Sequence, residues 1–174
     1  MTPKGDATDE AAQFDALVIG AGFSGLYMLH RLRQLGIRTR VLEMAENVGG
    51  TWLFNRYPGA RCDIESIEYS YSFSEEIQQE WVWTESMPAQ PEIEAYLNFV
   101  ADRLDLRRDI QFGTKVVAMV FDEEAAAWTL RTERGDSYTA PFVIAFGVLL
   151  IGAFIWIFLV NAEKSVVDRA QPAR

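Results

Sequence analysis

The sequence has a single cysteine and a single histidine in its 174 residues. One cysteine excludes a disulfide within the chain, and one histidine excludes the usual metal sites built from several histidines. Basic residues are also scarce, because 16 Lys and Arg stand against 25 Asp and Glu, which gives a formal net charge of -9. A chain this acidic offers no basic surface to a phosphate backbone, so nucleic acid is not expected as a partner. We expect its chemistry to come from a bound organic cofactor.

The length of the chain allows one domain with a real core, but not the two or three domains of a large oxidoreductase. Residues 1–13 are polar and acidic and have no apolar run, so they are not a signal peptide. We expect a disordered N-terminus followed by a cytoplasmic domain.

A strand, a helix and a second strand are predicted near the start of the domain. Residues 14–19 are a short apolar run that ends on glycine, as buried parallel strands do. Leucines three residues apart predict an amphipathic helix over residues 24–35, which Gly36 ends, and residues 37–42 form the next strand. Together they make a strand-helix-strand unit of about 30 residues.

Residues 47–75 show no helical period and are read as loops and short strands, whereas apolar spacing predicts a second helix over residues 91–104. Strands are predicted at residues 116–121, 128–132 and 137–139. The expected fold class is therefore α/β: a Rossmann-like domain over residues 14–141 with a parallel sheet and a small antiparallel β-meander.

The motif GAGFSG lies between the first predicted strand and the first predicted helix. Gly20 permits a tight turn, Gly22 lets the backbone approach a pyrophosphate, and Gly25 lets helix and strand pack closely. Glu43 follows 18 residues after Gly25, at a strand end where a carboxylate can accept hydrogen bonds from a ribose hydroxyl. The alternative is a merely tight turn, but this context favours dinucleotide binding.

Four stretches carry a resemblance to a known family: GAGFSGLYMLHRL, VGGTW, NRYPGARCDIESIEYSYSFSEE, and QPEI with the following YLNFVADRLDLR. From about residue 14 to residue 144 the sequence resembles the N-terminal, FAD-binding part of the Baeyer-Villiger flavin monooxygenases. In that family NADPH reduces the flavin, and a small ketone is oxygenated to an ester or lactone. The resemblance thus implies FAD and NADPH as cofactors.

The resemblance also implies roles for individual residues. It assigns the pyrophosphate of FAD to Gly20, Gly22, Ser24 and Gly25, and the adenosine ribose to Glu43. It assigns the neighbourhood of the flavin to Gly50, Thr51, Trp52 and Tyr69, and the adenine to the backbone of Val116.

The segment Arg61, Cys62 and Asp63 matches a family segment that lies near both the flavin and the nicotinamide. There the aspartate orients a catalytic arginine, a role that the resemblance gives to Asp63. An ordinary surface ion pair between Asp63 and Arg61 is the alternative. Cys62 has no histidine base beside it in the sequence, so a nucleophilic thiol is not expected, and His30 is read as a packed or solvated side chain.

The sequence also departs from the family pattern. The family's fingerprint histidine, a second glycine-rich turn for NADPH and the catalytic arginine have no match in it. We expect an FAD-binding fragment that is incomplete for oxygenation by itself. The alternative is a non-enzymatic flavin- or nucleotide-binding protein tethered to a membrane.

The apolar run over residues 142–160 contains 19 residues without a charge. As a helix it would be roughly 28 Å long, close to the hydrocarbon thickness of a bilayer. It is predicted to be a single C-terminal transmembrane helix in contact with lipid, followed by a polar tail over residues 161–174. A buried terminal helix or hairpin, a family strand in the first residues of the run, and a reading-frame accident remain alternatives.

Overall fold

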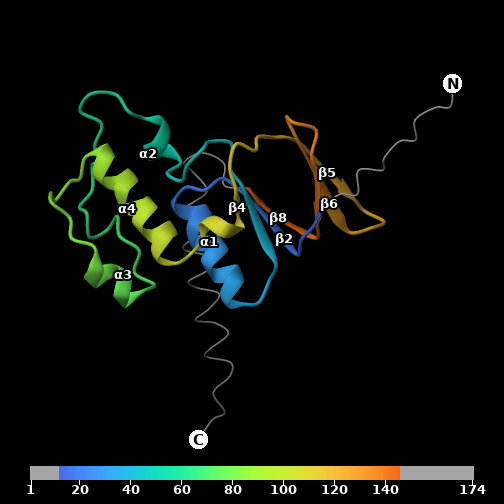
Figure 1. Cartoon of the computed structure of the whole chain (residues 1–174), viewed down its shortest axis with the longest axis horizontal. Coiled ribbons are helices and arrows are strands. Elements are labelled where there is room, and N and C mark those ends of the chain that lie inside the picture. The colour runs from blue at the N-terminus through green and yellow to red at the C-terminus, as the bar shows by residue number, and fades with distance from the viewer. Residues whose placement is uncertain (1–11, 146–174) are drawn as a thin grey trace, which may run out of the picture. The chain divides into compact units, whose positions relative to one another are not determined.

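The computed structural model describes residues 12–145, and all of these except Ala145 belong to one compact unit (Figure 1). The helices are α1 (Phe23–Gln34), α2 (Thr51–Phe54), α3 (Glu75–Glu80), α4 (Gln90–Arg103) and the 3-10 turn η1 (Arg107–Asp109). The strands are β1 (Ala12–Gln13), β2 (Ala16–Ile19), β3 (Thr39–Leu42), β4 (Ile110–Gln111), β5 (Val116–Asp122), β6 (Ala127–Thr132), β7 (Ser137–Ala140) and β8 (Phe142–Ala145). They form two four-stranded sheets.

The first sheet has the strand order β4-β3-β2-β8. Strand β3 pairs in parallel with β2 and with β4, and Val18 of β2 lies beside Val41 of β3. Leu17, Val18 and Val41 are all fully buried, so both faces of the sheet are covered, as continuous apolar strands require. Helix α1 packs against β2 and β3. The predicted α/β Rossmann-like fold with a parallel sheet is confirmed.

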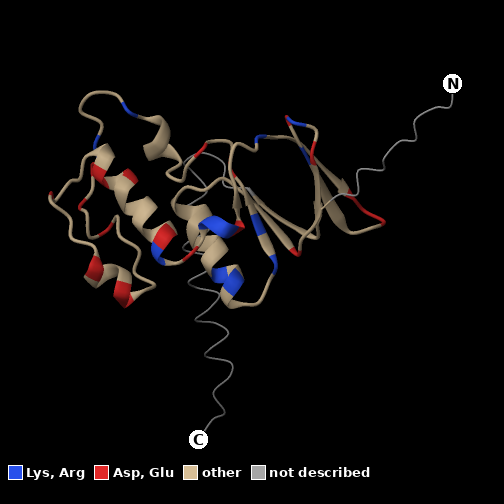
Figure 2. Ribbon diagram, in the orientation of Figure 1, with Lys and Arg blue, Asp and Glu red and all other residues tan. Residues whose placement is uncertain are grey.

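Residues 51–103, here called the helical lobe, connect β3 to η1 and hold α2, α3 and α4. A cluster of aromatic side chains surrounds the buried Ile77, Tyr96 and Val100. From Cys62 to Asp102 the lobe contains acidic residues but no Lys or Arg, and Figure 2 shows red segments along α3, α4 and their loops. The lobe is therefore negatively charged over most of its length.

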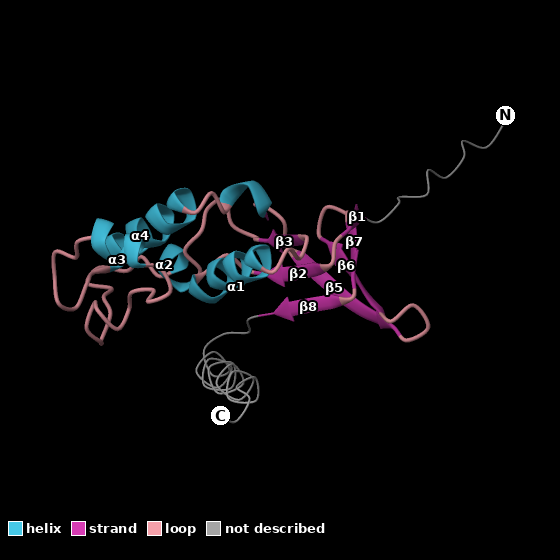
Figure 3. Cartoon of the chain, turned by 90° about the horizontal axis from the view of Figure 1, so that it is seen from below, coloured by secondary structure: helices cyan, strands magenta, loops and turns pink. Residues whose placement is uncertain are grey.

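The second sheet covers the other face of the parallel sheet. Its order is β1-β7-β6-β5, with antiparallel pairing among β5, β6 and β7, so the predicted β-meander is confirmed. Leu130 and Tyr138 of the meander pack against Leu17 and Leu42 of the parallel sheet. In Figure 3 the arrowheads of β2 and β8 point towards the helices, which places the carboxyl ends of these strands on that side.

The expectation of loops and short strands over residues 47–75 is wrong at residues 51–54, where the short helix α2 forms, and a second short helix, α3, which the sequence did not predict, begins at the end of this range. Helix α2 covers four residues, and α3 follows Ser74, whose hydroxyl accepts a hydrogen bond from the Ile77 amide at 3.3 Å. Helix α3 has six residues and only Ile77 of them is buried, so its sequence shows no repeating apolar spacing that would predict a helix. Its one local signal is the N-terminal serine followed by two glutamates.

Two expectations about the ends of the chain are corrected. Ala12 and Gln13, assigned to the disordered N-terminus, form β1 by pairing in parallel with β7. The transmembrane helix predicted over residues 142–160 is wrong at its start, because Phe142–Ala145 is strand β8 beside β2. Residues 146–160, like the polar tail 161–174, lie outside the described part of the chain. Among residues 12–145, no helix is both long enough and apolar enough to cross a membrane.

Candidate dinucleotide-binding site

The turn between β2 and α1 requires its glycines. Gly20 has a φ of +96°, a conformation that side chains disfavour, and its amide donates to the Leu42 carbonyl at 2.9 Å. A Cβ on Gly25 would lie only 1.9 Å from the Gly20 carbonyl oxygen and 3.8 Å from the Val18 side chain. Helix and strand can therefore approach this closely only with glycine at position 25.

A second glycine pair closes over the turn. A Cβ on Gly50, whose φ is +53°, would lie 3.0 Å from the Gly22 Cα, and the Gly49 amide donates to the Ala21 carbonyl at 3.1 Å. Two backbone segments thus touch without intervening side chains. Such bare backbone is the surface that lets a pyrophosphate approach peptide N–H groups closely.

Glu43 follows β3 directly and is buried, with 3% of its surface exposed. Its Oε2 accepts a hydrogen bond from the Ala21 amide at 2.6 Å, and its Oε1 accepts one from the Ala45 amide at 2.8 Å. The carboxylate therefore stabilises the glycine-rich turn, a role that the sequence did not predict. Each carboxylate oxygen has a further lone pair, so Glu43 can also accept from a hydroxyl.

Helix α1 begins at the turn, with Gly22 as its N-cap, no side-chain capping bond and no acidic residue in its first turn. Its first amides therefore face the turn without a competing carboxylate from the helix itself. Ser24 lies exposed in this first turn. A helix N-terminus in this state favours a negatively charged group.

Trp52 and Tyr69, both assigned to the flavin neighbourhood by resemblance, lie together. The Trp52 Nε1 donates to the Tyr69 hydroxyl at 2.7 Å, and Tyr69 packs edge-on against Phe23 at 4.9 Å between ring centroids. Burial raises the pKa of Tyr69, with Asp63 adding a smaller contribution in the same direction. Tyr69 therefore stays an uncharged phenol at neutral pH. Thr51 lies exposed at the start of α2.

The predicted alternative of an ion pair between Arg61 and Asp63 is not formed. Arg61 instead donates to the Glu85 carboxylate and to the Met87 carbonyl, both at 2.5 Å. Asp63 is exposed and makes no hydrogen bond or ion pair with any residue in 12–145. Cys62 is buried beside Trp52, so its thiol is shielded from solvent. The Asp63 carboxylate is thus available to a cation from outside these residues.

Val116 is the first residue of β5, and it follows a short segment, residues 113–115, that contacts Glu43. The Thr114 amide donates to the Glu43 carbonyl at 2.8 Å, and the Gly113 amide donates to the Ala45 carbonyl at 2.9 Å. The chain from Gly113 to Val116 therefore runs beside the residue assigned to the ribose. Val116, the predicted adenine contact, thus lies two residues beyond Thr114, which is hydrogen-bonded to Glu43, the predicted ribose contact.

Sequence reasoning missed several residues that build this site. Phe23 packs against Tyr69, Tyr71 and Tyr96, and the Tyr71 hydroxyl donates to the Phe23 carbonyl at 2.5 Å. The aromatics of the stretch IEYSYSF were the available signal, because so many aromatic side chains close together favour a packed cluster. The polar residues of α4 were also missed.

A glycine-rich strand-turn-helix with a buried acid after the next strand defines the class of dinucleotide-binding Rossmann-like domains. The family model described as "NAD(P)-binding Rossmann-like domain" matches residues 18–79.

Acetone monooxygenase (methyl acetate-forming) of Gordonia sp. (strain TY-5) is 52% identical over 130 residues, which are 75% of this chain and 24% of the relative. A Baeyer-Villiger monooxygenase of Pseudooceanicola batsensis is 46% identical over 143 residues, 82% of this chain and 26% of the relative. The solved structure of an oxidized steroid monooxygenase bound to NADP superposes with a TM-score of 0.76 at 57% sequence identity. The superposed part is 77% of this chain and 26% of the steroid monooxygenase chain.

The strong homologues of this chain, in sequence and in structure, are Baeyer-Villiger flavin monooxygenases, and the chain is similar to their FAD-binding domain. It spans about a quarter of the length of the relatives it matches.

Proposed function

We propose that residues 12–145 bind FAD and serve as the flavin-binding part of an NADPH-dependent Baeyer-Villiger monooxygenase that acts on a ketone. The observation that carries the proposal is the Gly22 and Gly50 contact beside the buried Glu43 carboxylate. FAD, when bound, would supply the redox chemistry of oxygen transfer. The residues of this chain would bind and orient it.

The carboxylate also selects among dinucleotides. Glu43 can accept hydrogen bonds from a free ribose 2'-hydroxyl, but it would repel the 2'-phosphate of NADPH. The glycine-rich turn is thus suited to FAD rather than to NADPH. The backbone amides at the start of α1 would hold the pyrophosphate, and Trp52 with Tyr69 would line the flavin.

Asp63 and Arg61 have different parts in this proposal. Arg61 is engaged by Glu85 and Met87, so it is not available as the cation that stabilises an oxyanion. Asp63 has no such partner among residues 12–145 and would orient a cation supplied from elsewhere. Oxygenation by the 174-residue chain alone is not expected, and ester analysis after incubation with NADPH, oxygen and phenylacetone tests this.

Membrane attachment through residues 146–160 remains a prediction from the sequence. It is tested by carbonate extraction of the full chain beside a version that ends at Ala145. Recovery of the full chain in the soluble fraction without detergent would contradict it.

The experiment for FAD binding is a titration of the apo chain with FAD and, separately, with NADPH. We expect FAD to bind with quenching of flavin fluorescence and NADPH not to compete. Glu43→Ala should lower FAD affinity roughly ten- to a hundredfold, because a charge-assisted acceptor is worth about 1.5 to 3 kcal/mol. Glu46→Ala removes the same charge three residues away on an exposed side chain and should leave the affinity unchanged. Equal affinities for the wild type and Glu43→Ala would reject the assignment of Glu43.

A further inference from the structure

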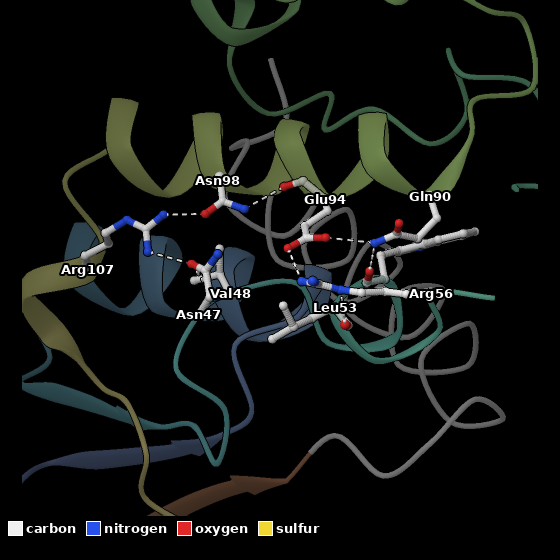
Figure 4. A network of polar contacts seen from close by, with 9 residues as sticks. Asn47, Val48, Leu53, Arg56, Gln90, Glu94, Asn98 and Arg107 are labelled. Atoms are coloured by element: carbon white, nitrogen blue, oxygen red, sulfur yellow. Dashed lines mark hydrogen bonds and ion pairs between the residues drawn. The ribbon is translucent and has the colours of Figure 1, made fainter. Parts of the chain in front are cut away.

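Helix α4 carries three polar side chains four residues apart. Gln90, Glu94 and Asn98 share one face of the helix because residues at i, i+4 and i+8 lie above one another. Arg107, in η1, continues this row beyond the end of the helix. Figure 4 shows the row facing the segment 47–56, which carries the second glycine pair of the site.

Arg107 connects this row of side chains to Asn47, the first residue of the segment 47–56. The guanidinium donates from Nη1 to the Asn47 Oδ1 at 2.9 Å, from Nη2 to the Asn98 Oδ1 at 2.6 Å, and from Nε to the Asp102 Oδ1 at 2.5 Å. The Asn47 Oδ1 also accepts from the Val48 amide at 2.9 Å. The rigid guanidinium has donors on three separate nitrogens, so it can bridge three acceptors on different segments in this way.

Glu94 connects the same row to Arg56, the last residue of the segment 47–56. Its Oε1 accepts from Arg56 at 2.6 Å, while its Oε2 accepts from Gln90 at 2.8 Å. Gln90 also donates to the Trp52 carbonyl, and Arg56 donates to the Leu53 carbonyl at 2.8 Å. The side chain of Glu94 is only 19% exposed, which strengthens its hydrogen bonds relative to surface pairs.

Between these two anchors lie Gly49 and Gly50, whose φ angles are +143° and +53°. Glycine loses more conformational freedom on ordering than any other residue, so this backbone must be fixed by its surroundings. The Gly49 amide reaches the Ala21 carbonyl only while the segment is held across the turn. The Arg107–Asn47 and Glu94–Arg56 hydrogen bonds therefore hold the two sides of the glycine pair that lies against Gly22.

We propose that Arg107 is a positioning residue for the dinucleotide site: by clamping Asn47 to α4 it preorganises the segment 47–50 against the glycine-rich turn and so sets FAD affinity. The inference rests on the proposed FAD binding. Loss of the clamp leaves the pyrophosphate surface to be ordered at the moment of binding, which costs affinity.

Arg103→Met provides a matched control for Arg107→Met. Arg103 is the last residue of α4, four residues before Arg107, and also makes three hydrogen bonds, but with Glu80 and Glu76 of α3 in the helical lobe. FAD affinity and thermal unfolding of the apo full chain are measured for both variants. We expect Arg107→Met to bind FAD roughly tenfold more weakly and Arg103→Met to bind like the wild type, with similar changes in melting temperature.

Hydrogen exchange of the apo chain gives a readout without flavin. In Arg107→Met the amides of Val48, Gly49 and Gly50 should exchange faster, while those of Leu17 and Val18 in β2 stay protected. Asn47→Ala, which keeps the Arg107 contacts to α4, should weaken FAD binding as much, and the double variant should add little.

The outcomes separate the two proposals. If the wild type does not bind FAD but the exchange at residues 48–50 rises as expected, the clamp stands and the proposed function fails. If the wild type binds FAD and both arginine variants lose affinity equally, or neither does, the inference is overturned. Additive losses in the double variant would also overturn it.

Discussion

The glycine-rich turn and the helical lobe build their halves of the site by different means. The turn uses backbone alone: Gly25 abuts Gly20, Gly22 abuts Gly50, and one carboxylate, Glu43, ties the turn to β3. The helical lobe uses side chains that are distant in sequence, as when Arg56 reaches Glu94 across 38 residues, and Arg107 of η1 reaches Asn47 across 60 residues in the same way. The first can be recognised in a short motif, whereas the second exists only once the chain has folded.

This difference predicts how each half tolerates change. Backbone contacts leave no room for adjustment, because any side chain collides with main-chain atoms that cannot rotate away. Contacts between side chains fail one bond at a time, and the remaining partners still hold the segment. Substitutions should therefore be all-or-none in the turn and graded in the lobe.

The largest effect is expected for Gly25→Ala. The new Cβ would lie 1.9 Å from the Gly20 carbonyl oxygen, so β2 and α1 would have to separate, at a cost of about 4 kcal/mol or more. Gly36→Ala is the control, because its φ is +73° with no atom within 4 Å of the new Cβ, so only backbone strain of about 1 to 2 kcal/mol applies. Urea denaturation measures both. Equal losses of stability would show that the close approach at Gly25 is not required.

A smaller and graded effect is expected from the buried tyrosines of the lobe at high pH. Burial raises the pKa of Tyr96 to about 12 and that of Tyr71 well above 10. Above about pH 10 the unfolded chain releases these protons while the folded chain keeps them, so stability falls as pH rises. Each phenol contributes up to about 1.4 kcal/mol per pH unit, and the contribution of Tyr96 is lost by about pH 12.

Denaturant titrations between pH 9 and pH 12 measure this slope. Tyr71→Phe should flatten it, and it should also lower stability at pH 8, since the Phe23 carbonyl loses its donor. A slope unchanged by Tyr71→Phe would mean that this phenol ionises equally in the folded and unfolded chains.

Sequence patterns predicted the parts of the fold that depend on near neighbours. Strands β2 and β3, helices α1 and α4 and the meander were all expected, because their apolar periods are local. Helix α3 was missed because only Ile77 is buried in it. The start of the apolar run was assigned to a helix, since a run such as FVIA suits either structure, and pairing with β2 decides for the strand.

The site divides in the same way. The glycines and Glu43 were predicted from spacing, but the two hydrogen bonds that Glu43 accepts from Ala21 and Ala45 were not, because they depend on the turn geometry. The side-chain row of α4 was not predicted at all. Its residues have the polar character of any solvated helix face, and only the position of the segment 47–56 distinguishes them.

The smallest effect is expected for Asp63→Asn, and it separates a carboxylate that the fold requires from one that it does not. Asp63 makes no hydrogen bond or ion pair among residues 12–145, so its loss should change the free energy of unfolding by less than about 0.5 kcal/mol. Burial is the main cause that raises the pKa of Tyr69, and the negative charge of Asp63 raises it further. Asp63→Asn should therefore lower the pKa of Tyr69 slightly, because a nearby negative charge disfavours the phenolate.

Absorbance at 295 nm across a pH titration, with Tyr69→Phe subtracted, measures that change, and urea denaturation measures the stability. Arg61→Gln is the comparison, since it removes the contacts to Glu85 and Met87 and should cost more stability than Asp63→Asn. A marked loss of stability in Asp63→Asn would show that the fold itself uses this carboxylate. If stability is unchanged, residues 12–145 do not need the exposed Asp63 carboxylate for folding, which leaves it available for the role proposed for it, the orientation of a cation supplied from elsewhere.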